Sequence, residues 1–369
     1  MRRVLVVAPT RRDLLNLADA RVLARYDLVF EERPGVQGVF GSSDSTAALA
    51  VVVADRLGLP GPGYEAFMRC HDKLVSRRIQ AEAVPEATPR FAPLDAMRPP
   101  ERPPLPFPFF VKPVQGHLSQ HAYEVDSDER LAEVLAAARR ASFRRLIAEQ
   151  LLSGHLVTFE GFMHDGEVTP VGVTDAVLHP NGISFLRFEY PSTLPAGPQE
   201  QMAEIASRLM PALGFDQSLF NIEFFVREDG RVTIVEVNGR MASQFAPLVK
   251  AVHGVSTYEL QLEIASGRTP HLPPPREDMV AASFLMRTYE DAIVRAVPDP
   301  TAVLERFGHA HVEVLVRPGQ RLSENDDDVV SHRLAVIALA GPDRASVLHR
   351  YDEALALMPF ELDPLPARV

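Results

Sequence analysis

The chain has 369 residues, of which 46% are apolar and 24% are charged, so it is long enough for two or three domains with substantial cores. Its 38 basic and 49 acidic residues give a formal charge of −11, and no run of lysine and arginine dominates a segment, which disfavours nucleic-acid binding. The single cysteine, Cys70, excludes an intrachain disulfide and a cysteine-rich metal site.

The first 75 residues are expected to form a small domain of the parallel α/β class. Apolar runs predict strands at 4–8 and 38–40, and helical spacing predicts helices at 11–26 and 45–57. Strand, helix, strand and helix in this order favour a parallel sheet. The loop at Gly41 lacks the Gly-rich fingerprints of nucleotide-binding loops, so a simple capped helix start is expected there.

No segment of the chain resembles a targeting or membrane-spanning element. The N-terminal apolar run is short and is followed at once by Pro9 and by charged residues, unlike a signal peptide. No stretch of the sequence approaches the roughly 18 apolar residues of a membrane span. These features predict a soluble protein of the cytoplasm.

Two proline clusters divide the rest of the chain. Residues 85–108 contain nine prolines without helical or strand periodicity and are expected to form an extended linker, and a second cluster lies at 270–275. Residues 76–272 mix strands and helices and predict an α+β domain. Residues 273–369 predict a smaller α+β domain, with strands at 281–287, 311–316 and 334–339 and a helix at 343–357.

The segments FNIEFFV and VTIVEVNGR predict a β-hairpin around Asp229-Gly230, the favoured dipeptide of a two-residue turn. Counting back from that turn pairs Glu223 with Glu236, as well as Asn221 with Asn238 and Phe225 with Ile234. Two carboxylates about 5 Å apart across strands repel each other, and a divalent cation would reverse that penalty. Carboxylate and amide oxygens suit Mg²⁺ or Mn²⁺. Two alternatives remain open: an exposed hairpin with solvated glutamates, and a three-residue loop with a bulge that breaks this register.

Three further segments carry polar groups at the ends of predicted elements. Lys112 ends an apolar strand and is followed by the loop Gly116-His-Leu-Ser119, where an ammonium and backbone N–H groups could bind phosphate. Lys73 opens a predicted helix, and the segment EQLLSG ends a predicted strand. Each segment alone is a weak indication, because most lysines at strand ends are solvated.

In this order, the segments resemble the ATP-grasp superfamily. The matching features are Lys73 with Arg77 and Arg78, then VKP with its Gly/Ser loop, EQLLSG, IEFF and EVNGR, over about residues 60–270. The resemblance implies an ATP-grasp fold at 76–272, with the nucleotide between two α+β subdomains. It also implies a lid subdomain at about 106–160, in which residues 116–121 form a mobile lid.

The resemblance assigns a role to each matching residue. It implies that ATP is bound by Lys73, Lys112, Gly116, Ser119, Glu149, Gln150, Leu151 and Leu152, the last four at the adenine hinge. It implies that Mg²⁺ or Mn²⁺ is bound by Glu223, Glu236 and Asn238, and that Arg240 is catalytic and supports the transferred phosphoryl group or the acyl intermediate. Two positions depart from the family pattern: His121 replaces a frequent glycine, and Leu156 replaces a frequent carboxylate, so no ribose contact is assigned.

The expected reaction is ligation of a carboxylate and an amine. The C-terminal stretch is similar to the C-terminal domain of biotin carboxylase, but the position of the carboxylase base holds Gln244, which cannot take a proton at neutral pH. The segment RFEYPSTLP is similar to carboxylate–amine ligases that join amino acids. The resemblance therefore implies an ADP-forming ligase that activates a carboxylate as an acyl phosphate and couples it to an amine, forming an amide or peptide bond.

The resemblance also bears on substrates and on alternative functions. Arg187, Ser243 and Gln244 are candidates for contact with the small-molecule carboxylate and amine substrates, and a homodimer is expected from the family. The alternatives are a biotin-carboxylase-like carboxylating enzyme and a non-catalytic nucleotide-binding module, the latter favoured by His121 and Leu156.

Overall fold

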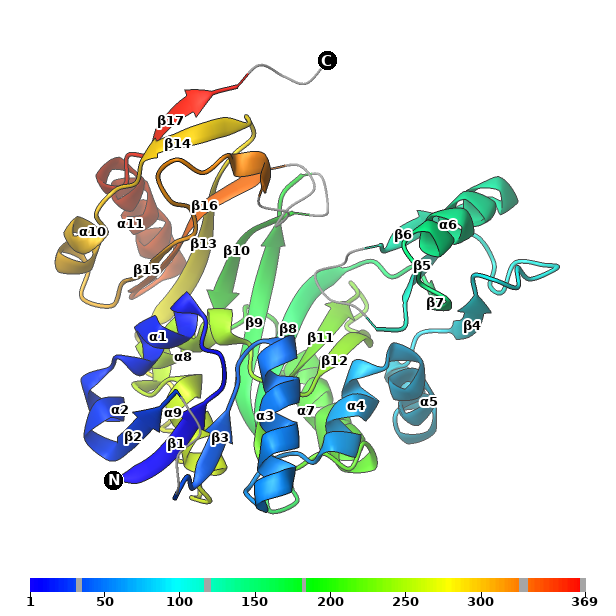
Figure 1. The fold of residues 1–369 in the computed structure, drawn as a ribbon, viewed down its shortest axis with the longest axis horizontal. Coiled ribbons are helices and arrows are strands. Elements are labelled where there is room, and N and C mark those ends of the chain that lie inside the picture. Colours follow the sequence, from blue (N-terminus) through cyan, green and yellow to red (C-terminus); the bar gives the residue numbers. More distant parts are fainter. Residues whose placement is uncertain (31–34, 116–120, 181–183, 325–330, 366–369) are drawn as a thin grey trace.

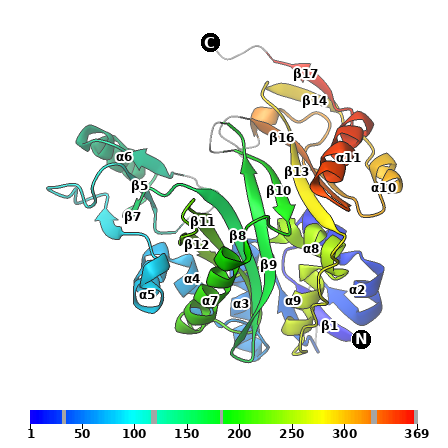
Figure 2. The ribbon, with the colours of Figure 1, turned by 180° about the vertical axis from the view of Figure 1, so that it is seen from behind.

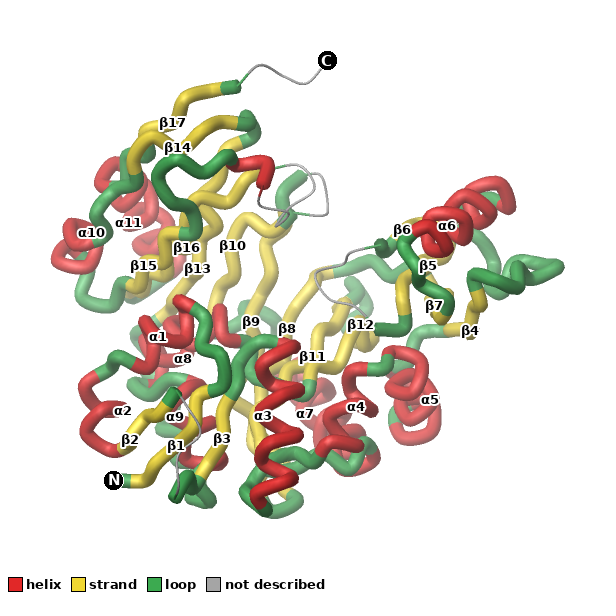
Figure 3. Tube along the Cα trace, in the orientation of Figure 1, coloured by secondary structure: helices red, strands yellow, loops and turns green. Residues whose placement is uncertain are grey.

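The structure is a computed structural model that describes residues 1–30, 35–115, 121–180, 184–324 and 331–365. Its centre is an eight-stranded antiparallel sheet in the order β12-β11-β8-β9-β10-β13-β16-β15 (Figure 1). Three smaller sheets surround it, with the orders β2-β1-β3, β4-β7-β5-β6 and β14-β17. The strands of the large sheet run through the middle of the molecule, and helices lie on both of its faces (Figure 3).

The N-terminal unit is a three-stranded parallel sheet with helices, as the sequence predicts. Its strands are β1 (Arg2–Val6), β2 (Tyr26–Val29) and β3 (Gly38–Phe40), and its helices are α1 (Arg11–Leu17), α2 (Ala20–Arg25) and α3 (Asp44–Leu57). The single helix expected at 11–26 is wrong. The side chain of Asp19 accepts a hydrogen bond from the backbone of Arg21 and starts a second helix, and Tyr26 then begins a strand.

A second unit projects to one side of the molecule, apart from the N-terminal and C-terminal units (Figure 1). Helices α4 (Tyr64–His71) and α5 (Lys73–Ala83) and the 3₁₀ turn η1 (Pro85–Ala87) lead into it. It contains strands β4 (Phe91–Asp95), β5 (Phe109–Pro113), β6 (Tyr123–Val125) and β7 (Arg145–Gln150), with helix α6 (Asp128–Arg140) packed on the sheet through its apolar side.

The projecting unit overlaps the range of about 106–160 in which a lid subdomain is expected. Two features differ from the sequence-based expectation. The proline-rich stretch is not an extended linker throughout, because its residues Phe91–Asp95 form strand β4, which pairs with β7. Pro93 is compatible with this strand because β4 lies at the edge of the sheet, where a missing N–H costs no pairing on the open side. The next strand, which begins at His155, belongs to the large sheet instead.

The large sheet is assembled from distant parts of the chain. Its strands are β8 (His155–His164), β9 (Glu167–Leu178), β10 (Phe185–Tyr190), β11 (Ser218–Val226), β12 (Val232–Asn238), β13 (Val280–Thr288), β15 (His311–Val314) and β16 (His332–Gly341). Helix α7 (Ala196–Ala212) lies across β8 and β9 on one face (Figure 2). Helices α8 (Ala246–His253) and α9 (Thr257–Ala265) and the N-terminal unit share a core with the other face.

The C-terminal part continues the same sheet, since β10 pairs with β13. It adds β14 (Ala292–Ala296), β17 (Glu361–Pro364), α10 (Thr301–Arg306), the 3₁₀ turn η3 (Leu322–Glu324) and α11 (Arg344–Leu357) around its own apolar cluster. The helix expected at 343–357 is confirmed. Within the described parts of the chain, no helix has the length and apolar character needed to cross a membrane.

Candidate active site

The hairpin of β11 and β12 places two glutamates opposite each other. Glu223 pairs with Glu236 and Asn221 pairs with Asn238, as predicted, but the turn is different. The backbone N–H of Arg227 donates to the carbonyl of Arg231 over 3.0 Å, which closes a three-residue loop, and Gly230 in that loop has a positive φ of 79°. The predicted two-residue turn is therefore wrong, and the expected contact of Phe225 with Ile234 is absent from the register.

A β-bulge at Val235 restores the register that the longer loop shifts. Phe224 pairs with Ile234, whereas Glu223 pairs with Glu236, so Val235 is the extra residue of β12. As a consequence, Ile234 packs in the core beneath the sheet, on the face opposite Glu236. The carbonyl of Val235 accepts a hydrogen bond of 2.6 Å from Nη2 of Arg77, so a buried guanidinium on α5 holds the bulge.

The two opposed carboxylates differ in their surroundings. Oε1 of Glu236 lies 2.8 Å from Nζ of Lys73, the first residue of α5. Burial acts to raise the pKa of Glu236, but the charges of Lys73 and Lys112 outweigh it and lower that pKa. Burial and the facing charge of Glu236 raise the pKa of Glu223. The two carboxyl groups of the pair therefore differ, because the pKa of Glu236 is lowered whereas that of Glu223 is raised.

The donor set fits a hard divalent cation completed by phosphate oxygens. The two carboxylates and the Asn238 amide share one face of the hairpin, and Mg²⁺ usually takes one or two carboxylates plus substrate phosphates. Within the residues that the structure describes, no group of three or more His, Cys, Asp and Glu side chains could hold a metal.

A row of polar side chains crosses the sheet beside the carboxylates. Nδ2 of Asn238 donates to Oδ1 of Asn221 over 3.0 Å, and Nδ2 of Asn221 donates to the carbonyl of Arg240 over 2.9 Å. On the next strand, Oε1 of Glu160 accepts the backbone N–H of Ala242 over 2.9 Å. Burial raises the pKa of Glu160 to about 8. This row fixes the chain just after β12. Glu160 is not among the predicted site residues, because in the sequence it is a lone carboxylate within an apolar strand.

The projecting unit contributes a buried ion cluster around Glu149. Oε2 of Glu149 lies 2.7 Å from Nζ of Lys112, and its Oε1 lies 2.7 Å from Nε of Arg77. Burial acts to raise the pKa of Glu149, but the two cations outweigh it and lower the pKa to about 2. Because Arg77 also contacts Val235, one guanidinium joins β7 of the projecting unit to β12 at the carboxylate pair.

The remaining ATP-site candidates lie at the end of β7 or outside the described residues. Gln150 is the last residue of β7, and its backbone N–H donates to the carbonyl of Arg90 over 2.8 Å. Leu151 and Leu152 follow directly, and the side chain of Leu151 is exposed. Gly116 and Ser119 lie outside the residues that the structure describes. His121 has a positive φ of 56°, a backbone conformation in which glycine is common.

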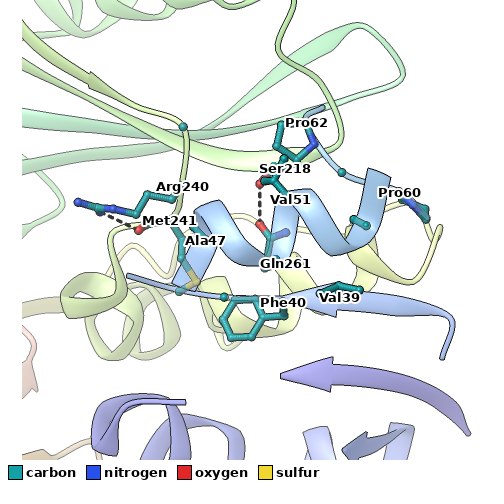
Figure 4. A pocket seen from close by; sticks show the side chains of 15 residues that line it. Val39, Phe40, Ala47, Val51, Pro60, Pro62, Ser218, Arg240, Met241 and Gln261 are labelled. Carbon is teal, nitrogen blue, oxygen red and sulfur yellow. Dashed lines mark hydrogen bonds between the residues drawn. The ribbon is translucent and has the colours of Figure 1, made fainter. Parts of the chain in front are cut away.

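Arg240 meets the N-terminal unit. Its Nε forms an ion pair with Oδ1 of Asp44, the first residue of α3, and its Nη1 donates to the carbonyl of Met241 over 3.2 Å. Figure 4 shows Arg240 at one end of a pocket between α3, β3 and the ends of β11 and β12, with its side chain directed away from the other lining residues. On the far side of the pocket, Oγ of Ser218 donates to Oε1 of Gln261 over 3.2 Å.

The three candidates for substrate contact lie in different places. Ser243 and Gln244 belong to the 3₁₀ turn η2 (Ser243–Phe245), a few residues past Arg240. Arg187 lies on β10, where its Nε contacts Oε1 of Glu189 over 2.6 Å. Strand pairing across β10, β9, β8 and β11 puts Arg187 on the face of Phe224, opposite the face of Glu223. The structure therefore does not bring Arg187 to the carboxylate pair.

The chain is similar in sequence to several known proteins. The family model of the ATP-grasp domain matches residues 105–247. An uncharacterized protein, y4rH, of Sinorhizobium fredii (strain NBRC 101917 / NGR234) is 26% identical over 342 residues, which are 89% of this chain and 69% of that protein. The D-alanine–D-alanine ligase of Corynebacterium jeikeium (strain K411) is 29% identical over 262 residues, which are 65% of this chain and 67% of the ligase.

Solved structures share the fold over nearly the whole chain. The L-amino acid ligase from Bacillus licheniformis has a TM-score of 0.76 at 16% identity and covers 98% of both chains. The biotin carboxylase domain of the Hydrogenobacter thermophilus 2-oxoglutarate carboxylase has a TM-score of 0.74 at 15% identity, over 98% of this chain and 91% of that one. The similarity to both structures includes the C-terminal part that follows β12.

Proposed function

Because this chain has the ATP-grasp fold and carries an ATP-grasp domain, as its sequence predicts, we propose that it is an ATP-dependent carboxylate–amine ligase. In this reaction the γ-phosphoryl group of ATP passes to a carboxylate, an amine attacks the acyl phosphate, and ADP and phosphate are released. The observation that carries the proposal is the geometry around Glu223 and Glu236, where a carboxylate pair, Lys73 and Arg240 meet at one end of the hairpin.

Each group has a distinct task in the proposed reaction. Mg²⁺ held by Glu223, Glu236 and Asn238 would neutralise charge on the phosphate oxygens during transfer. Lys73, which is ion-paired with Glu236, would contact the same phosphates. Arg240, held through its own carbonyl by Asn221, would orient the substrate carboxylate and stabilise the charge that develops on the transferred phosphoryl group.

Glu149 and Arg77 support this arrangement from the projecting unit. Glu149 fixes the ammonium of Lys112, and Arg77 fixes Glu149, so the lysine assigned to ATP is oriented before the nucleotide binds. Arg77 simultaneously holds the Val235 bulge that aligns Glu236 with Glu223. The Arg77 side chain therefore contacts both the nucleotide end and the metal end of the proposed site.

Ligation is favoured over carboxylation by the residue four positions past Arg240. A biotin-dependent carboxylase uses a glutamate there as a base in the family pattern, and this chain has Gln244. An amide side chain does not accept a proton at neutral pH. Named sequence relatives, such as the D-alanine–D-alanine ligases of Brucella suis, Corynebacterium jeikeium and Nocardia farcinica, are also ligases.

The test is product analysis with Mg·ATP across a matrix of amino acids and small carboxylates. We expect release of ADP and inorganic phosphate that requires two substrates, a carboxylate and an amine. Formation of AMP and pyrophosphate would contradict the acyl-phosphate route. Tight ATP binding without turnover for any pair would favour the alternative of a non-catalytic nucleotide-binding module.

A further inference from the structure

Asp44 of the N-terminal unit lies at the proposed active site, where it is ion-paired with Arg240. It lies 196 residues before Arg240 in the chain, and the two side chains are ion-paired with 24% and 20% of their surfaces exposed. The pair is therefore sheltered but still reachable by a small molecule. The negative charge of Asp44 also acts to raise the pKa of Glu236 and of His71. Asp44 therefore lies near the carboxylate pair, at the proposed metal end of the site.

The backbone around Asp44 holds its carboxylate in place. Ser43 caps α3 in a reciprocal capping box with Thr46, so the first turn of the helix is well defined. Gly41 packs so tightly on this turn that an added Cβ would lie 2.3 Å from the carbonyl oxygen of Thr46. A charged group on such a turn is a prearranged contact for a ligand, because little ordering is needed on binding.

The charge balance at Arg240 distinguishes two classes of carboxylate. A simple carboxylate that approaches Arg240 meets a guanidinium that already has a carboxylate partner, so two negative groups share one cation. An α-amino acid brings a positive ammonium group next to its carboxylate. That ammonium can pair with Asp44 while the carboxylate pairs with Arg240, so every charge keeps an opposite neighbour.

We propose that Asp44 recognises the ammonium group of the substrate whose carboxylate is activated, so that this substrate is an α-amino acid and not a simple carboxylic acid. The inference rests on the proposed function, in which Arg240 faces the carboxylate that receives the phosphoryl group. It assigns the N-terminal unit a specificity role, through one side chain on α3.

The experiment uses hydroxylamine, which traps an acyl phosphate as a hydroxamate, so the natural amine need not be known. Hydroxamate and ADP formation with Mg·ATP are measured for pairs that differ only in the amino group, such as alanine with propionate and leucine with 4-methylpentanoate. The proteins are the wild type, Asp44→Asn, and the control Asp27→Asn. Asp27 is an ion-paired aspartate of the same unit, 2.7 Å from Arg3 on the neighbouring strand.

For the wild type and the control we expect a preference of about 10- to 100-fold in kcat/KM for the amino acid, the effect of one charge-assisted pair. Asp44→Asn should reduce that preference to a few-fold, mainly through slower reaction of the amino acid. Equal losses for both members of each pair would overturn the inference, since Asp44 would then only orient Arg240. A wild-type preference for the deaminated acid would overturn it as well.

A binding measurement separates failure of this inference from failure of the proposed function. If the wild type forms no ADP with any carboxylate, the ligase proposal fails. Calorimetric titration of the same substrate pairs into protein loaded with Mg²⁺ and a non-hydrolysable ATP analogue then still tests Asp44. Amino acid binding that weakens about tenfold or more in Asp44→Asn, and stays unchanged in Asp27→Asn, supports the ammonium site, and equal binding to wild type and Asp44→Asn overturns it.

Discussion

Replacing Glu149 with glutamine should destabilise the chain at neutral pH through one identifiable group. Glu149 is 5% exposed, and its carboxylate sits between Arg77 and Lys112 at 2.7 Å from each. These cations lower its pKa from an ordinary 4.5 to about 2, and that difference corresponds to about 3 kcal/mol of stability at pH 7. Estimated the other way, leaving two buried cations without their carboxylate typically costs about 3–5 kcal/mol, which agrees with this figure.

The pH dependence identifies the source of this effect. The folded pKa of Glu149 lies below the unfolded value, so its contribution is fully present above about pH 4.5 and is lost as the pH falls toward 2. The glutamine variant lacks the contribution at every pH. The difference in unfolding free energy between wild type and Glu149→Gln should therefore be constant from pH 8 to 5 and should shrink at lower pH, where the wild type takes up the proton.

Urea unfolding at a series of pH values measures that difference. The matched control is Glu133→Gln on α6 of the same projecting unit, whose carboxylate is 67% exposed and lies 2.9 Å from Arg130. The control should change stability by less than about 1 kcal/mol at any pH. A Glu149→Gln penalty as small as that of the control, or one that does not change between pH 5 and 3, would refute the reasoning.

Three further predictions concern Glu236, Arg77 and the buried thiol of Cys70. Glu236→Gln should lower ADP formation by more than about 100-fold with little loss of folding stability, because it removes a ligand charge without changing volume; full activity would refute the metal assignment. Arg77→Lys should lower the free energy of unfolding in urea by about 2–4 kcal/mol and weaken Mg·ATP binding in calorimetry, because an ammonium cannot reach Glu149 and Val235 together. Unchanged ATP affinity would contradict the proposed role of Arg77 in joining the nucleotide end to the metal end of the site. Burial raises the pKa of the Cys70 thiol to about 12. Iodoacetamide at pH 8 should therefore label this thiol only after unfolding. Rapid labelling of the folded chain would contradict the burial of Cys70.

The sequence predicts the hairpin carboxylates because their signal is local. Side chains alternate along a strand, and Asp229-Gly230 marks the turn, so Glu223 and Glu236 can be paired by counting. The count succeeds although the loop has one more residue than expected, because the bulge at Val235 compensates. That bulge is held by Arg77, 158 residues earlier in the chain, and no local pattern contains such information.

The contrast between local signals and distant contacts also explains why one strand and two site residues are not predicted from the sequence. Strand β4 is hidden by the prolines around it and forms only because β7 supplies a partner for an edge strand. Glu160 has no local signal, and its role depends on a backbone N–H located 82 residues later. Asp44 likewise becomes part of the site only when α3 of the N-terminal unit packs against the segment after β12. Contacts between distant segments are set by tertiary packing, which a single sequence does not display.

The central claim is that the phosphoryl group of ATP passes to a substrate carboxylate at the metal end of the hairpin. The direct test is a reaction with Mg·ATP and an amino acid whose carboxylate carries ¹⁸O, followed by ³¹P NMR of the products. The proposed route transfers one ¹⁸O atom from the carboxylate to inorganic phosphate, because the acyl phosphate breaks between its carbon and that oxygen. Amide product accompanied by unlabelled phosphate, or by ¹⁸O in AMP, would contradict the account.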